Sequence, residues 1–256
     1  MTRPKLIIVL ILLLASAKTF ACSCAPSLLT DNFQRSQFVA KAKILKVTPD
    51  PTNENYHDAE IELLTLYKGE RLKKIKIHSV MNTSCAFLPS EKSTWIIFAS
   101  VWEGKLSFGA CSGSLELGRT FDAVAYPNAN KNYSRSIELK QQVIAYLQKH
   151  NILNPNPFGF HVYNEQLKLL KGYKNKNRFA VFQLEVNKDL SITDLKLLQG
   201  FQNRALNKAV VSNVKENLKL RNTSGKPVLK PVRMVVFCYF YEQEDTHQSF
   251  LSFFDI

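Results

Sequence analysis

Five short segments with strand-like patterns follow one another between residues 38 and 111, and no helical pattern separates them. They alternate apolar and polar side chains, except for the fourth, which is almost wholly apolar. Lys68-Gly69-Glu70 and Glu103-Gly104 are turn sequences between them. A period of two residues is typical of half-buried strands. The sequence therefore predicts a small closed antiparallel barrel or a sandwich. The segments are residues 38–47, 59–67, 73–80, 94–102 and 105–111.

The rest of the chain has a different pattern. Residues 121–135 gather turn formers, and residues 136–150 place Ile137, Val143, Ile144 and Leu147 at helical spacing. Asn154-Pro155-Asn156-Pro157 predicts a domain boundary. Beyond it, two strands, a helix and a long strand predict a small α+β domain of order β-β-α-β. These elements are expected at residues 179–186, 191–198, 203–217 and 228–241.

The N-terminus has the three-part build of a secretory signal peptide. Arg3 and Lys5 precede the uncharged residues 6–17, and Thr19 and Ala21 lie three and one before the expected cut. A membrane anchor is the alternative, but the apolar run of about 12 residues is shorter than the roughly 20 that span a bilayer. The chain could instead be cut before Cys22 and acylated on that cysteine, as in bacterial lipoproteins, although Thr19 and Phe20 fit that signal poorly.

These boundaries divide the chain into four parts. The expected parts are a signal peptide at 1–21, a β domain at 22–120, a linker with a helix at 121–157, and an α+β domain at 158–256. We expect the protein to be secreted or held in the periplasm or cell envelope, with an outer-membrane lipoprotein as the alternative.

The composition supports a globular, basic protein. Removing residues 1–21 takes away three basic and no acidic residues, which lowers the formal charge from +13 to +10. Nucleic acid, an anionic envelope or an acidic partner could all match this charge. No recognition helix or zinc-finger spacing accompanies it, so the basic residues are interpreted as a solvated surface without a nucleic-acid partner.

The chain has five cysteines, and export would bring them into an oxidising compartment where disulfides form. Cys22 and Cys24 stand two residues apart and point to opposite sides of an extended segment, so each should bond elsewhere. Cys238 lies inside an apolar strand, where a buried free thiol is expected.

Several of these residues resemble a known family. Cys22-Ser23-Cys24 directly follows the expected signal peptide, and Tyr67-Lys68-Gly69, Met81-Asn82-Thr83-Ser84-Cys85-Ala86-Phe87 and Cys111 come later. This order resembles the netrin-like (NTR) domain of the tissue inhibitors of metalloproteinases (TIMPs) over residues 22–120. The resemblance implies a five-stranded OB-fold barrel with the disulfides Cys22–Cys85 and Cys24–Cys111. The family's third barrel disulfide and its cysteine-rich second subdomain have no counterpart in this chain.

The resemblance also implies how such a protein acts. The free amine and the carbonyl oxygen of Cys22 would chelate the catalytic zinc of a metalloproteinase, because that zinc keeps an open position. Ser23 would enter the protease's main side-chain pocket. The expected protease-contacting residues are Cys22, Ser23, Cys24, Ala25, Thr83, Ser84 and Cys85.

A second resemblance covers residues 179–241. The hairpin around Asn187-Lys188-Asp189, the helix from Asn203, and Ser224-Gly225-Lys226-Pro227-Val228 are similar to the C-terminal domain of the TonB energy transducers. This resemblance implies a bacterial origin and a module that binds envelope proteins, for example by strand addition at a sheet edge.

No pattern for catalysis is present. The five histidines lack metal-ligand spacing, and no nucleophile elbow, phosphate loop or dinucleotide fingerprint occurs. The chain is therefore interpreted as a non-enzyme without a cofactor. Two hypotheses follow: a secreted metalloproteinase inhibitor, or a non-inhibitory envelope adaptor that binds proteins.

Overall fold

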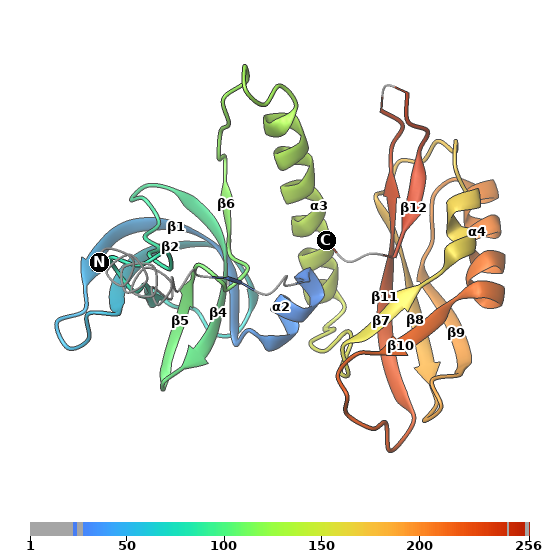
Figure 1. The fold of residues 1–256 in the computed structure, drawn as a ribbon, viewed down its shortest axis with the longest axis horizontal. Helices are drawn as coiled ribbons and strands as arrows, with labels where there is room; N and C mark the ends of the chain where they lie inside the picture. Colours follow the sequence, from blue (N-terminus) through green and yellow to red (C-terminus); the bar gives the residue numbers. More distant parts are fainter. Residues whose placement is uncertain (1–22, 25–27, 245, 254–255) are drawn as a thin grey trace, which may run out of the picture.

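The computed structural model of the chain describes residues 23–24, 28–244, 246–253 and 256. Its N-terminal half forms a closed barrel of five strands (Figure 1). The hydrogen-bonded order is β1-β2-β3-β5-β4, and pairing between β1 and β4 closes the ring. The closed barrel is therefore confirmed, and the sandwich alternative is wrong. The strands are β1 (Phe38–Pro49), β2 (Tyr56–Lys68), β3 (Lys74–His78), β4 (Thr94–Trp102) and β5 (Lys105–Gly109).

The barrel is mixed, which corrects the expectation of an antiparallel one. Strand β3 pairs with β5 in parallel, with His78 opposite Gly109, and the other pairs in the ring are antiparallel. The reason is topological, because an odd number of strands cannot alternate in direction all the way round a closed ring. A short strand, β6 (Leu115–Leu117), is added outside the ring on β4.

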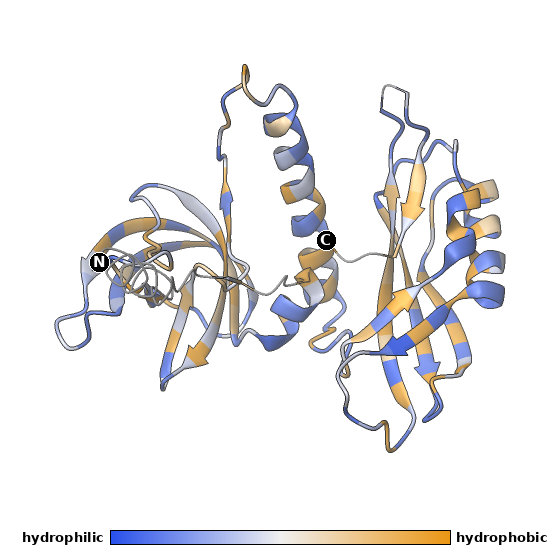
Figure 2. Ribbon diagram, in the orientation of Figure 1, coloured by the Kyte–Doolittle hydropathy of each residue, from blue (hydrophilic) through white to orange (hydrophobic). Residues whose placement is uncertain are grey.

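Alternation along the strands fills the barrel interior. On β1, Phe38, Ala40, Ala42 and Ile44 belong to the interior core, whereas Val39 belongs to a cluster outside the barrel. Figure 2 shows the same alternation as orange and blue bands along the barrel strands. The pattern in the sequence therefore matches the two faces of the sheet.

Two helices cover the outside of the barrel. Helix α2 (Leu29–Arg35) follows the N-terminal segment, and α3 (Ala129–Lys149) lies between the barrel and the second sheet (Figure 1). Helix α3 begins seven residues before its predicted start at 136. Its first turns are held by tertiary hydrogen bonds, and they contain no apolar stripe from which the helix could be predicted. Asn130 exchanges hydrogen bonds with the backbone of Phe121, and the Tyr133 hydroxyl donates to the Glu116 carbonyl.

The C-terminal part contains the predicted β-β-α-β order with additional short elements. Its main sheet has the order β12-β11-β8-β9, and β10 pairs separately with β7. The last long strand begins at Val232, after Pro231, rather than at 228. The elements are β7 (Phe160–Tyr163), the 3-10 helix η1 (Glu165–Leu169), β8 (Phe179–Val186), β9 (Ile192–Gln199), α4 (Arg204–Asn217), β10 (Lys219–Asn222), β11 (Val232–Tyr241) and β12 (Phe250–Ser252).

Both faces of the two central strands of this sheet, β8 and β11, are largely buried. Leu206, Val210 and Val214 of α4 belong to the core on one face. The other face joins a cluster around α3, where Tyr146 contacts the rings of Phe179 and Phe237 edge-on at 5.9 and 5.8 Å. Helix α3, expected in a linker, thus takes part in a core with both sheets. The buried members of that cluster are Leu29, Phe33, Val39, Ile96, Phe98, Leu139, Val143, Ile144, Tyr146, Leu147, Phe179, Val181, Phe237 and Tyr239.

None of the helices in the described part of the chain is both long and apolar enough to cross a membrane. The expected signal peptide, residues 1–21, lies outside the described residues.

Candidate functional site

A disulfide fastens the N-terminal segment to the barrel. Cys24 bonds Cys111, with their Cα atoms 5.2 Å apart, across 87 residues of sequence. Cys111 lies two residues after β5 ends, and the turn there is held by a hydrogen bond from the Ser112 amide to the Gly109 carbonyl at 3.0 Å. The predicted Cys24–Cys111 pairing is therefore present, and Ser23 and Cys24 are both exposed beside it.

The loop between β3 and β4 carries the other expected contact residues. Thr83 and Ser84 are exposed, and Cys85 is half-buried. The Thr83 hydroxyl donates to the Val80 carbonyl at 2.7 Å and accepts from the Cys85 amide at 3.1 Å. These bonds fold the tip of the loop into a compact turn.

Aromatic packing anchors the same loop. The Phe87 ring meets the Trp95 and Phe108 rings edge-on, with centroids 5.5 and 5.9 Å apart. The Phe87 amide donates to the hydroxyl of the fully buried Ser79 at 2.8 Å. The exposed tip is therefore tied to the barrel core a few residues away.

The parallel pairing of β3 and β5 places the two features at the same end of the barrel. Both strands run in one direction and His78 lies opposite Gly109, so the loop with Thr83 and the turn with Cys111 leave adjacent strands side by side. The approach is close, since a β-carbon on Gly109 would lie 2.5 Å from the His78 carbonyl oxygen.

Two expected contact residues, Cys22 and Ala25, lie outside the described residues. Cys85 takes part in a disulfide. Its expected pairing with Cys22 stays a prediction, as does the role of the Cys22 amine.

Cys238 is a free and fully buried thiol in β11. Burial raises the pKa of this thiol far above its ordinary value, because the thiolate would lose its hydration. Such a thiol has no nucleophilic role at neutral pH. Within the described ranges, no group of three or more His, Cys, Asp or Glu side chains could hold a metal ion.

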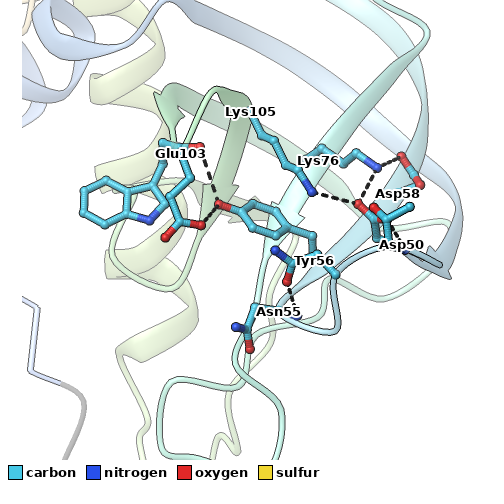
Figure 3. Close-up of polar contacts among 10 residues, drawn as sticks. Asp50, Asn55, Tyr56, Asp58, Lys76, Glu103 and Lys105 are labelled. Atoms are coloured by element: carbon cyan, nitrogen blue, oxygen red, sulfur yellow. Dashed lines mark hydrogen bonds and ion pairs between the residues drawn. The ribbon is translucent and has the colours of Figure 1, made fainter.

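A charged cluster that sequence reasoning missed surrounds the turn between β1 and β2 (Figure 3). Asp50 Oδ2 accepts from Lys76 Nζ at 2.8 Å and from Lys105 Nζ at 3.2 Å, and Lys76 Nζ lies 2.8 Å from an Asp58 oxygen. The Thr52 amide and hydroxyl donate to Asp50 Oδ1 at 2.8 and 2.6 Å. Asp50 followed by Pro51 has the pattern of an ordinary turn, so no local signal pointed to this cluster.

The cluster continues to a buried tyrosine. Lys105 Nζ lies 4.5 Å from the centre of the Tyr56 ring, and the Tyr56 hydroxyl is 3.3 Å from Glu103 Oε2. Tyr56 is fully buried. Burial, with a further contribution from Glu103, raises the pKa of Tyr56.

The contacts within the cluster favour the ionised forms of Asp50 and Lys76. The hydrogen bond from Lys76, followed by those from Thr52, holds the pKa of Asp50 far below its usual range. The Asp50 hydrogen bond, in turn, raises the pKa of Lys76. Because Lys76 and Lys105 both pair with Asp50, the cluster ties the β1–β2 turn to β3 and β5.

Comparison with known proteins adds no assignment: no protein-family model matches this chain, and no curated protein matches it.

Proposed function

We propose that this protein is a secreted inhibitor of a zinc metalloproteinase, acting through its mature N-terminus at Cys22. The observation that carries the proposal is the Cys24–Cys111 disulfide, which fixes the third residue of the expected mature chain on a closed barrel. The ring order β1-β2-β3-β5-β4 also supports assigning the barrel to the OB fold that the inhibitor family has.

The chemistry of the proposal needs a free amine close to neutrality. An α-amino group has a reference pKa of about 7.7–8.0, low enough to lose its proton to a zinc ion at neutral pH. The nitrogen and the carbonyl oxygen of Cys22 together would displace the zinc-bound water of the protease.

A pre-ordered segment strengthens such binding. Ordering a flexible backbone costs about 1–2 kcal/mol per residue, and this cost is subtracted from the affinity. The Cys24–Cys111 disulfide reduces that cost beside the reactive end, and the compact loop at Thr83 and Ser84 adds an exposed contact next to it.

The test compares three forms of the secreted protein against a panel of soluble zinc metalloproteinases. The mature form should begin with an unmodified Cys22 by mass spectrometry and should inhibit at least one protease. A form with one alanine added ahead of Cys22 should lose inhibition while keeping its thermal unfolding midpoint. A matched control with one alanine inserted between Ser224 and Gly225, in an exposed loop, should inhibit as the mature form does. Equal inhibition by the form extended ahead of Cys22 would refute the chelation mechanism.

An edge strand supports a second candidate, the non-inhibitory envelope adaptor. Strand β9 pairs with β8 alone among the described strands, and its other edge borders a groove of about 690 Å³. The groove also touches Lys215 and Leu220, at the end of α4 and in β10. An extended segment of an envelope protein could add to β9 there. An acylated Cys22, or a cut elsewhere, combined with no inhibition, would favour this candidate over the first.

A further inference from the structure

One edge of the C-terminal sheet is open. The sheet has the order β12-β11-β8-β9, and β9 pairs with β8 alone among the described strands (Figure 1). Backbone N–H and C=O groups along the other side of β9 are therefore a template for a further strand. A groove of about 690 Å³ is lined by residues 189–195, so a second strand has space along this half of the edge.

The two faces of β9 differ in chemistry. Leu195 lies opposite the fully buried Leu184 of β8 and packs against the core that includes α4. Its two neighbours, Asp194 and Lys196, are exposed, and they lie on the other face because successive side chains of a strand alternate. The edge therefore has an apolar residue flanked by two opposite charges.

The charge of Asp194 is not compensated within the sheet. Its neighbour on β8 is Glu185, and the β-carbons of directly opposite residues lie about 4.5–5.5 Å apart. Glu185 already pairs with Arg233 of β11, whose Nε lies 2.6 Å from Oε1 of the glutamate. The ion pairs that the described residues form include neither Asp194 nor Lys196. Like charges directly opposite one another destabilise a sheet, so Asp194 favours a cation on its open side.

A second copy of the chain would supply that cation. When two antiparallel β9 strands are related by a two-fold axis through Leu195, this leucine lies opposite its own copy. Asp194 of each copy then lies opposite Lys196 of the other copy, because the two residues are equally far from the axis. Both charges are matched in this register, and the two leucines meet on the core face of the sheet.

We propose that β9 is the interface of a homodimer, in which the four-stranded sheets of two copies join edge to edge. The inference rests on β9 and not on the N-terminal segment, so it stands whether or not the protein inhibits a protease. It assigns to a second copy the edge that an envelope protein would use in the adaptor candidate. One strand pair buries less than the roughly 1,200 Å² at which standard stable interfaces begin, so the dimer should dissociate at micromolar concentrations.

Sedimentation equilibrium of the mature protein, with its disulfides intact, measures this dimer. Between about 1 μM and about 1 mM, the range of weak affinities, the mass should rise from that of one chain toward that of two. Asp194→Lys and Lys196→Asp each bring like charges opposite one another twice, so each variant should dimerise at least about tenfold more weakly. A mass that stays at one chain throughout would overturn the proposal and leave the edge to a different protein.

Mixing the two variants separates pairing from folding. In the mixture, one chain carries two lysines and the other two aspartates at positions 194 and 196, so both cross-pairs are complementary. An equimolar mixture should therefore dimerise about as well as the unaltered protein, although neither variant does so alone. Glu54→Lys, at an exposed position in the β1–β2 turn, makes the same change in net charge as Asp194→Lys and should leave the dimer unchanged. Undiminished dimerisation of either β9 variant alone, or no dimer in the mixture, would show that the interface lies elsewhere.

Discussion

Replacing Leu147 with alanine tests whether the barrel and the C-terminal sheet share one core through α3. Leu147 is 0% exposed and lies in the cluster that contains residues of both sheets. A buried Leu→Ala change removes transfer free energy and leaves a cavity, which costs about 2–5 kcal/mol. For a protein of this size, each kcal/mol lowers the unfolding midpoint by about 2–4 °C, so we expect a fall of about 4–20 °C. The exposed Leu229, at 75%, supplies the control, since Leu229→Ala should change stability by less than about 0.5 kcal/mol.

The protein offers a separate reporter for each part. Its two tryptophans, Trp95 and Trp102, both lie in β4 of the barrel, and the buried thiol of Cys238 lies in β11 of the C-terminal sheet. Urea unfolding followed by tryptophan fluorescence and by thiol labelling should show both midpoints shifted by Leu147→Ala. The reasoning is refuted if the thiol becomes reactive at lower urea while the tryptophan midpoint stays where it was, because the two sheets would then unfold without a common core.

Three further changes test other parts of the structure. Replacing both Cys24 and Cys111 with serine should lower the free energy of unfolding by about 2–5 kcal/mol, since their bridge spans 87 residues; a urea midpoint equal to that of the unaltered protein would contradict this. Asp50→Asn should destabilise the protein at neutral pH. Because its pairing with Lys76 lowers the folded-state pKa of Asp50, that stability is present above the unfolded pKa of about 3.9 and is lost as the pH falls through the folded value. The difference between Asp50→Asn and the unaltered protein, measured by urea unfolding, should therefore shrink as the pH falls below about 4, and a constant difference from pH 7 to pH 2 would count against the mechanism. Cys238 should react with a thiol reagent only after denaturation, as one equivalent per chain without reduction, and rapid labelling of the folded protein would contradict its burial.

Local sequence patterns were sufficient to predict most of the helices and strands. Alternation over 38–47 and the almost wholly apolar run over 94–102 predicted β1 and β4 to within two residues, and the four-residue spacing from Leu206 to Val214 predicted α4. These elements are predictable because the burial of each is set by neighbouring residues, with a period of two or of about four where one face is buried and as a continuous apolar run where both are.

The start of α3 was not predictable in this way. Its first turns depend on Asn130 and Tyr133, whose partners lie in the preceding segment around Glu116 and Phe121. A polar helix start that is held by tertiary hydrogen bonds leaves no apolar stripe in the sequence.

By itself, the sequence determined the five barrel strands, the later half of α3 and the β-β-α-β order of the C-terminal part. Only the tertiary structure decided that β3 runs parallel to β5 and that Asp50 meets Lys76 and Lys105. The physical reason is that periodicity reports burial along one segment, whereas these features depend on how the ring closes and on which charged groups packing then brings together from distant parts of the chain.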